Sequence, residues 1–210
     1  MSRLRSSCSV LAATAVASVV LAPAASATAS PPGIPSTSTA QSQLAGLPVE
    51  TEGAMTGYSR DEFNHWITRD GCDTRESVLA RDGDGVEAGS DCRPTSGDWY
   101  SEYDGESFTD AGDLDVDHVV PLAEAWRSGA DSWSADDREA FANDLEGPQL
   151  IAVSASSNRS KGDQDPSTWW PTRTAYECTY AKMWVATKYR WGLALQSAEK
   201  TALANRLESC

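Results

Sequence analysis

The sequence predicts an exported α+β domain that is held together by two disulfides. Three observations lead to this fold class. The amino-terminal segment has the form of an export signal, and an even number of cysteines follows it. In the remaining chain, short apolar runs alternate with segments that have helical periodicity, which is typical of a mixed domain.

Residues 1–27 form the predicted signal peptide. Arg3 and Arg5 precede an apolar run over residues 10–22, and residues 25–27 (Ala-Ser-Ala) offer the small side chains that a signal peptidase reads. The apolar run is shorter than the roughly 18 residues that a membrane-spanning helix needs. We therefore expect a secreted, extracellular protein with no membrane segment in its mature form.

Composition divides the rest of the chain into a linker and one domain. Residues 28–45 carry no charge and are rich in Ser, Thr, Pro and Ala, which predicts a flexible linker. Residues 46–210 have the length of a single domain. We expect this domain to be a monomer.

The first part of the domain predicts little regular structure. Ser59 and Glu62 have the spacing of a capping box, so residues 59–69 predict a short helix. Residues 81–98 are rich in turn-forming residues. Trp99 to Tyr103 predicts the start of a strand.

The second part contains clearer signals. Apolar residues between 114 and 120 predict a strand that Pro121 ends. The apolar run at residues 150–153 predicts a buried strand. Cap residues and apolar spacing predict helices over residues 134–143, 174–190 and 197–208.

Four cysteines remain after the signal is removed: Cys72, Cys92, Cys178 and Cys210. In an exported chain, this even number predicts two disulfides. Three pairings are open, and the nearest-neighbour option would join the first two cysteines and the last two. A zinc site is the weaker interpretation, because the sequence contains no C-x2-C pair.

Acidic residues dominate the charge of the chain. There are 31 Asp and Glu residues against 17 Lys and Arg, giving a formal net charge of -14. This balance argues against a protein that coats nucleic acid or an anionic membrane through bulk charge. All the lysines lie from Lys161 onward. A site for an anionic ligand should therefore be built largely from the last quarter of the chain.

Two separated motifs carry the predicted chemistry. Asp117 and His118 place a carboxylate beside an imidazole, and a strand end is needed to bring both side chains into one site. Downstream, Asn158, Arg159 and Lys161 follow the 150–153 strand after a short polar turn, as the start of a helix would. An acid, an imidazole, an amide oxygen and basic side chains together fit a one-metal phosphodiester site.

These motifs resemble the secreted bacterial HNH-endonuclease family, which is related to the C-terminal nuclease domain of GmrSD-type restriction enzymes. The resemblance extends over most of the mature chain, through GCDTRESVL (71–79), DLDVDHVVPLAEAW (113–126), FANDLEGPQLIAV (141–153) and NRSKGDQDPSTWWP (158–171). It implies a ββα-metal (HNH) nuclease core with additional helices. It also implies an endonuclease that hydrolyses phosphodiester bonds in DNA, with RNA as an alternative substrate, and leaves 5'-phosphates. The sequence has no second DNA-reading motif, which indicates little sequence specificity.

The resemblance implies a role for each motif residue. His118 would be the general base that takes a proton from the attacking water. Asp117 and Asn158 would hold one divalent cation, with Mg²⁺ preferred over Mn²⁺ or Ca²⁺. Lys161 and Arg159 would contact the substrate phosphate.

One position departs from the family pattern. The amide that orients the catalytic histidine is normally an Asn nine residues before the final Asn, and here that position is Gln149. Either Gln149 or Asn143 is expected to make this contact with His118, and the sequence leaves the choice open. Gln149 is also the one point in favour of a rival class, a non-catalytic, disulfide-stapled extracellular binding module that retains the HNH fold.

Overall fold

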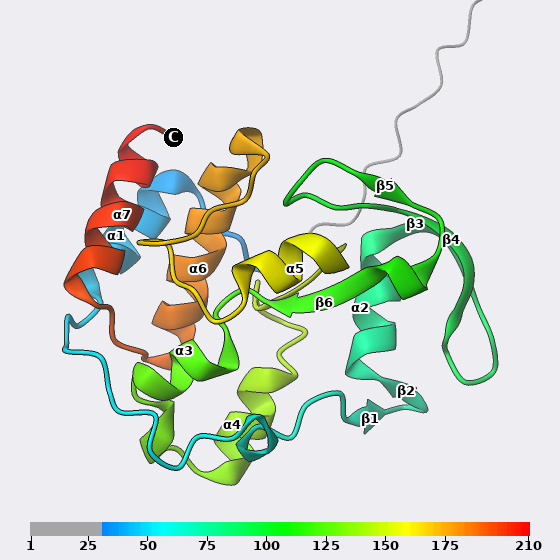
Figure 1. Ribbon diagram of the computed structural model, residues 1–210, viewed down its shortest axis with the longest axis horizontal. Helices are drawn as coiled ribbons and strands as arrows, with labels where there is room; N and C mark the ends of the chain where they lie inside the picture. The colour runs from blue at the N-terminus through cyan, green and yellow to red at the C-terminus, as the bar shows by residue number, and fades with distance from the viewer. Residues whose placement is uncertain (1–30) are drawn as a thin grey trace, which may run out of the picture.

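The computed structural model describes residues 31–210, and the predicted signal peptide lies outside them. Helices and strands are mixed along these residues, which confirms the α+β class (Figure 1). The helices are α1 (Thr37–Gly46), α2 (Thr74–Asp82), α3 (Leu122–Arg127), α4 (Ala135–Ala142), α5 (Ala155–Lys161), α6 (Glu177–Trp191) and α7 (Ser197–Glu208). The strands are β1 (Thr68–Arg69), β2 (Cys72–Asp73), β3 (Gly83–Ala88), β4 (Pro94–Tyr100), β5 (Ser107–Phe108), β6 (Leu114–His118) and β7 (Leu150–Ser154). Four 3-10 turns complete the order: η1 (Arg60–Glu62), η2 (Ala111–Asp113), η3 (Ala130–Ser132) and η4 (Thr174–Tyr176).

The predicted ββα unit lies at the centre of the domain. Strands β6 and β7 pair antiparallel, with His118 opposite Leu150. The Ser154 side chain accepts a hydrogen bond from the Ser157 amide and so caps α5, which follows β7 directly and lies along β6 (Figure 1). This arrangement confirms the ββα core and places the second sequence motif beside the first.

The β6–β7 ribbon separates two apolar clusters because its side chains alternate between the two faces. Leu114 and Val116 pack with α2 and Trp99 of β4 in the smaller cluster. Ile151 and Val153 point into the larger cluster, which includes residues of α1, α3, α6 and α7. Each large side chain that is fully buried in these clusters contributes about 1.5–3 kcal/mol. The ribbon is therefore held on both faces.

The predicted linker is wrong for residues 37–45, which form most of α1. Ser36 caps this helix by accepting a hydrogen bond from the Thr39 amide. Ala40 and Leu44 lie four residues apart on one face and are buried against α6 and α7. Tertiary packing, which composition does not reveal, stabilises the helix. The folded part therefore begins before residue 46.

Three further expectations in the first part of the domain are also wrong. The strand predicted to start at Trp99 instead ends at Tyr100, the last residue of β4. The predicted helix over residues 59–69 is limited to η1, because the backbone is already extended at Phe63 (φ −109°, ψ 94°). Further along, Trp66 has a φ of 60°, which a right-handed helix does not allow. Residues 81–98, predicted as turns, contain most of the antiparallel β3–β4 hairpin. A Cβ atom at Gly83 would lie 2.5 Å from the Trp99 indole nitrogen, so this glycine permits close packing within the hairpin.

The helices predicted in the second part are confirmed, with small shifts of their ends. Ser134 caps α4, which covers the segment predicted at residues 134–143. Helix α6 begins three residues later than predicted because η4 precedes it. Helix α7 begins and ends at the predicted residues. No helix among residues 31–210 is long and apolar enough to cross a membrane.

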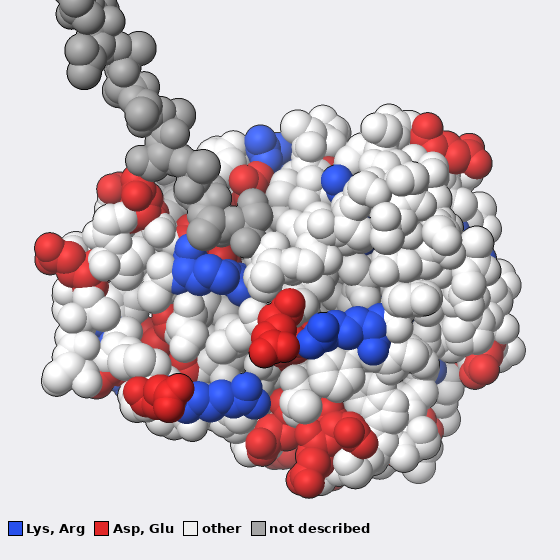
Figure 2. All heavy atoms as spheres, turned by 180° about the vertical axis from the view of Figure 1, so that it is seen from behind, with Lys and Arg blue, Asp and Glu red and all other residues white. Residues whose placement is uncertain are grey.

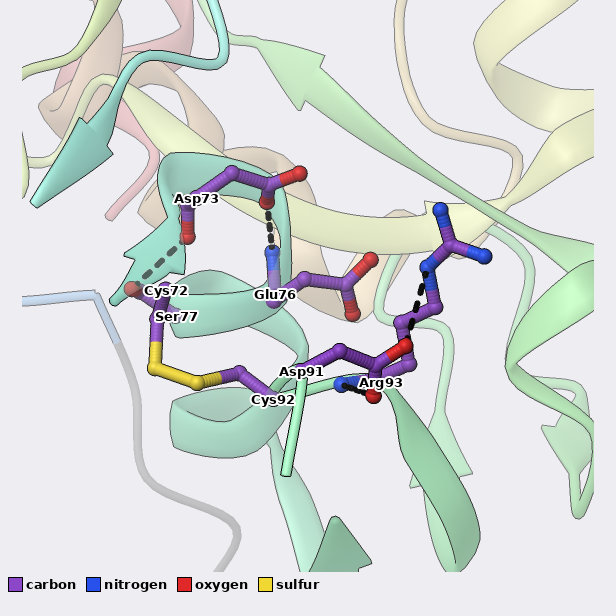
Figure 3. Close-up of a disulfide and its surroundings, with 7 residues drawn as sticks. All are labelled: Cys72, Asp73, Glu76, Ser77, Asp91, Cys92 and Arg93. Carbon is purple, nitrogen blue, oxygen red and sulfur yellow. Dashed lines mark hydrogen bonds and ion pairs between the residues drawn. A yellow bond between two sulfur atoms is a disulfide. The ribbon is translucent and has the colours of Figure 1, made fainter. Parts of the chain in front are cut away.

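Both predicted disulfides form, with the nearest-neighbour pairing. Cys72 bonds to Cys92 and Cys178 bonds to Cys210. In the first, the loop between β3 and β4 is fastened to the start of α2, where Asp73 caps the helix by accepting a hydrogen bond from the Glu76 amide (Figure 3). The second ties the start of α6 to the carboxyl-terminal residue, which follows α7.

A buried charge cluster joins helices α3, α6 and α7. The Lys188 ammonium lies 2.7 Å from carboxylate oxygens of both Glu124 and Glu199, and all three side chains are fully buried. Burial raises the pKa of Glu124, but Lys188 and the hydrogen bonds from Ser128 and Arg127 outweigh this effect and lower the pKa overall. Removing one charge would leave its partners buried and uncompensated.

Candidate active site

A pocket of about 200 Å³ opens at the end of strand β6. Six of the residues that line it are polar or charged: Arg60, Asp117, His118, Asn158, Arg159 and Asp163. The pocket is polar and large enough to hold several water molecules. Four of the predicted site residues therefore meet in one place, because the strand ends at His118 and α5 lies alongside it.

The His118 ring is held firmly in the wall of this pocket. Its Nε2 atom lies 2.9 Å from the Ala142 carbonyl oxygen, and the Trp66 ring stacks on it at 5.2 Å between centroids. A carbonyl only accepts hydrogen bonds, so Nε2 carries the proton and Nδ1 keeps a free lone pair. Burial lowers the pKa of His118 to about 3, and the imidazole is therefore neutral.

Asp117 points into the interior, where both of its carboxylate oxygens accept hydrogen bonds. Lys161 Nζ lies 2.9 Å from Oδ1, and the Tyr103 hydroxyl lies 2.7 Å from Oδ2. Burial raises the pKa of the Asp117 carboxyl, and the Lys161 ammonium acts against this rise. The two contacts fix the carboxylate at the inner wall of the pocket.

The structure contradicts the expectation that Lys161 contacts substrate phosphate. Its side chain is completely buried, and besides Asp117 its ammonium donates to the His118 carbonyl oxygen at 2.9 Å. Lys161 therefore connects α5 to the end of β6. The sequence shows a basic residue in this motif, which the structure places at the end of α5, but it does not show the direction in which the side chain points.

Neither Gln149 nor Asn143 forms a hydrogen bond with the His118 imidazole, which corrects the expectation that one of them orients it through such a bond. The Gln149 side chain instead forms two hydrogen bonds with the backbone of Val120. Its Oε1 accepts from the Val120 amide at 3.0 Å, and its Nε2 donates to the Val120 carbonyl at 2.8 Å. Gln149 thus fixes the chain just beyond Asp117 and His118.

Asn143 acts on a different segment. Its Oδ1 accepts hydrogen bonds from the Ile67 amide and the Thr74 hydroxyl, and its Nδ2 donates to the Asn64 carbonyl at 2.8 Å. These bonds hold the segment that carries Trp66 over His118. The Ala142 carbonyl, which holds the imidazole, could not be predicted, because a backbone acceptor leaves no mark in the sequence other than its place beside Asn143.

Asn158 and Arg159 approach the pocket from α5. Asn158 Nδ2 donates to Asp115 Oδ2 at 3.1 Å, so its carbonyl oxygen is the atom that can bind a cation. Arg159 lies 3.5 Å from the same carboxylate oxygen, and its side chain is 76% exposed. This guanidinium is accessible to an anionic ligand.

The donor atoms in the pocket fit a magnesium ion held by few protein ligands. Asp117 and Asn158 supply hard oxygen atoms, and each Asp117 oxygen keeps a second lone-pair direction beside its hydrogen bond. Mg²⁺ commonly binds one or two carboxylates and keeps several waters, for which the pocket has room. Among residues 31–210, no three His, Cys, Asp or Glu side chains are grouped so that they could hold a metal ion, so a cation in this pocket would have few protein ligands.

Comparison with known proteins places most of the chain in a family. Residues 90–206 match the family described as "GmrSD restriction endonucleases, C-terminal domain". A protein of Arthroderma benhamiae, described as "Uncharacterized secreted protein", is 54% identical over 181 residues, which are 86% of this chain and 89% of that protein. No solved structure matches the chain significantly. This relative and the two disulfides confirm a secreted location, and the relative is fungal, so the expected restriction to bacteria is not supported.

Proposed function

Because this chain belongs to the family of GmrSD restriction endonuclease C-terminal domains, we propose that it is a secreted, metal-dependent endonuclease that hydrolyses phosphodiester bonds in nucleic acid. DNA is the proposed substrate, with RNA as the alternative. One observation carries the proposal: the His118 imidazole, the Asp117 carboxylate and the Asn158 amide line a single pocket. An acid–base group beside cation ligands is what phosphodiester hydrolysis requires.

His118 is the proposed general base. The bond from Nε2 to the Ala142 carbonyl and the stacked Trp66 ring fix the imidazole, so Nδ1 accepts the proton of the attacking water. The negative charge of a bound phosphate would raise the pKa of His118 from about 3 toward its ordinary range and make the ring a stronger base.

Asp117 and Asn158 are the proposed ligands of one divalent cation, Mg²⁺ in preference to Mn²⁺ or Ca²⁺. The cation would supply positive charge to the scissile phosphate and to the departing 3'-oxygen, so that the products carry 5'-phosphates. Lys161 and Tyr103 hold the Asp117 carboxylate in place from the interior. Arg159, exposed at the rim, binds phosphate.

The acidic surface supports weak and local binding of nucleic acid. With a net charge of -14, the chain repels a polyanion outside the pocket, so few phosphates are neutralised in the complex. An enzyme of this kind depends on its cation for binding as well as catalysis, and it discriminates little between sequences.

The ion pair between Asp117 and Lys161 favours the rival function, a binding module without activity. A fully buried ammonium already neutralises the proposed cation ligand, which weakens its attraction for a second cation. The two candidates differ in one measurable respect, because only the endonuclease produces new phosphate ends.

The test compares the mature wild-type protein with His118→Ala on supercoiled plasmid and on single-stranded RNA. Each substrate is incubated with Mg²⁺, Mn²⁺, Ca²⁺ or chelator, and thermal unfolding of both proteins is recorded as a folding control. We expect wild-type cleavage that needs a divalent cation and is lost in a folded His118→Ala protein. No cleavage with any cation would support the binding module, and equal cleavage by the variant would show contamination or a different base.

A further inference from the structure

Arginine side chains in this structure are almost always paired with acidic ones. Among residues 31–210, every arginine except Arg60 and Arg69 has a nitrogen within 4.0 Å of a carboxylate oxygen. On the face shown in Figure 2, most of the visible basic side chains lie beside acidic ones. In so acidic a chain, a guanidinium without a carboxylate partner is an exception that calls for an explanation.

Arg60, which has no carboxylate partner, lies at the rim of the candidate active site. It is exposed and lines the same pocket as His118 and Arg159. It opens the turn η1, which Ser59 caps from one side and the fully buried Phe63 anchors from the other. The turn therefore fixes the backbone of Arg60 beside the pocket.

A histidine holds the Arg60 side chain. His65 Nδ1 lies 2.8 Å from the Phe63 carbonyl oxygen, so Nδ1 carries the proton and Nε2 is an acceptor. Arg60 Nε donates to this Nε2 atom at 3.2 Å. The bond occupies one of the five N–H groups of the guanidinium and leaves its two terminal nitrogens available as a donor pair.

We propose that Arg60 binds a phosphate of the nucleic-acid substrate and that His65 is the residue that positions it. The inference rests on the proposed function. The sequence motif suggests Lys161 as the phosphate-binding cation, but its ammonium is buried in an ion pair with Asp117. Arg159 forms an ion pair with Asp115. The planar guanidinium of Arg60 can donate two parallel hydrogen bonds to two oxygens of one phosphate. Because Arg60 has no carboxylate partner, it can bind this phosphate without breaking an ion pair.

The test measures binding of a labelled DNA duplex by the wild-type mature protein and by matched variants over a series of salt concentrations, in Ca²⁺ and in chelator. Arg69→Ala is the control, because Arg69 is also exposed and without a carboxylate partner but lies outside the pocket. We expect Arg60→Ala to weaken binding about tenfold and to reduce the salt slope of the binding constant by about one, while Arg69→Ala changes neither. Arg60→Lys should restore the salt slope but only part of the affinity.

The role of His65 is tested by a double-mutant cycle. His65→Phe keeps an aromatic ring beside Trp66 and removes the acceptor for Arg60. We expect it to weaken DNA binding in the wild-type background and to have no further effect in Arg60→Ala, because a positioning residue acts only through its partner. Equal weakening in both backgrounds would show that His65 is merely structural and would overturn its assignment.

The outcomes separate this inference from the proposed function. Equal effects of Arg60→Ala and Arg69→Ala, or no binding by the wild type at low salt, would overturn the phosphate assignment. If the wild type binds DNA through Arg60 yet cleaves neither DNA nor RNA, the endonuclease proposal fails and the phosphate site stands. If the wild type cleaves and Arg60→Ala binds and cleaves equally well, the endonuclease stands and the inference fails.

Discussion

Replacing Lys161 with methionine tests whether this residue supports the site from within or contacts substrate. Methionine fills a similar volume without a charge. It leaves the Asp117 carboxylate buried with only the Tyr103 hydroxyl as its partner. Removing one partner of a buried ion pair costs about 3–5 kcal/mol of unfolding free energy. We therefore expect Lys161→Met to be strongly destabilised.

The loss is large enough to measure by thermal unfolding. For a domain of this length, 1 kcal/mol corresponds to about 2–4 °C, so the midpoint should fall by roughly 6–20 °C. Lys182→Met is the control, since Lys182 lies in α6 and forms no ion pair among the described residues; its cost should stay within about 0.5 kcal/mol. Adding Asp117→Asn to Lys161→Met should recover part of the loss, because no charge then remains unpaired.

Two results would contradict this reasoning. One is a Lys161→Met protein that unfolds at the wild-type temperature, which would mean that the ion pair is absent or exposed. The other is a stable Lys161→Met protein with weaker DNA binding and a reduced salt slope, which would mean that the ammonium reaches a phosphate.

The remaining predictions concern the framework of the site. Cys72→Ser combined with Cys92→Ser opens a loop of 20 residues and should lower the unfolding free energy by about 3 kcal/mol in urea titrations; a loss below about 1 kcal/mol would be too small for a crosslink that constrains the unfolded chain. Folding lowers the pKa of Glu124, so its carboxylate stabilises the protein above the unfolded pKa of about 4.3, and this contribution is lost as the pH falls through the folded pKa. Glu124→Gln should consequently lose less stability than wild type on acidification, and parallel pH curves would contradict the shift. Gln149→Leu leaves the amide and carbonyl of Val120 buried without partners, at about 1–3 kcal/mol each, which thermal unfolding will show; unchanged stability with lost cleavage would instead indicate a direct catalytic contact.

Much of the central unit could be predicted because its signals are local. The apolar residues of β6 and β7 and the serine cap of α4 act within a few residues of their own position. The wrong predictions concern segments whose structure depends on tertiary packing, which composition does not reveal. Helix α1 contains mostly small and polar residues and is stable only because Ala40 and Leu44 are buried against other helices.

The same division applies within the candidate site. The sequence identifies Asp117, His118 and Asn158 by residue type and spacing, and the structure brings them to one pocket. The sequence does not identify the group that holds the His118 imidazole, because the Ala142 carbonyl belongs to the backbone 24 residues away. Nor does the sequence predict that Arg60, from the acidic part of the chain, lines this pocket, because an anion site is expected largely from the last quarter of the chain.

The sequence by itself therefore determined the cysteines available for disulfides, the ββα unit and the types of reactive group, and it predicts an export signal that lies outside the described residues. Only the tertiary structure decided how those groups are used: Lys161 inward on Asp117, Gln149 on the backbone of Val120, and Arg60 outward at the rim. The physical reason is that residue type fixes what a side chain can bind. Burial and the contacts between distant segments fix the direction in which it points and the partner that it reaches.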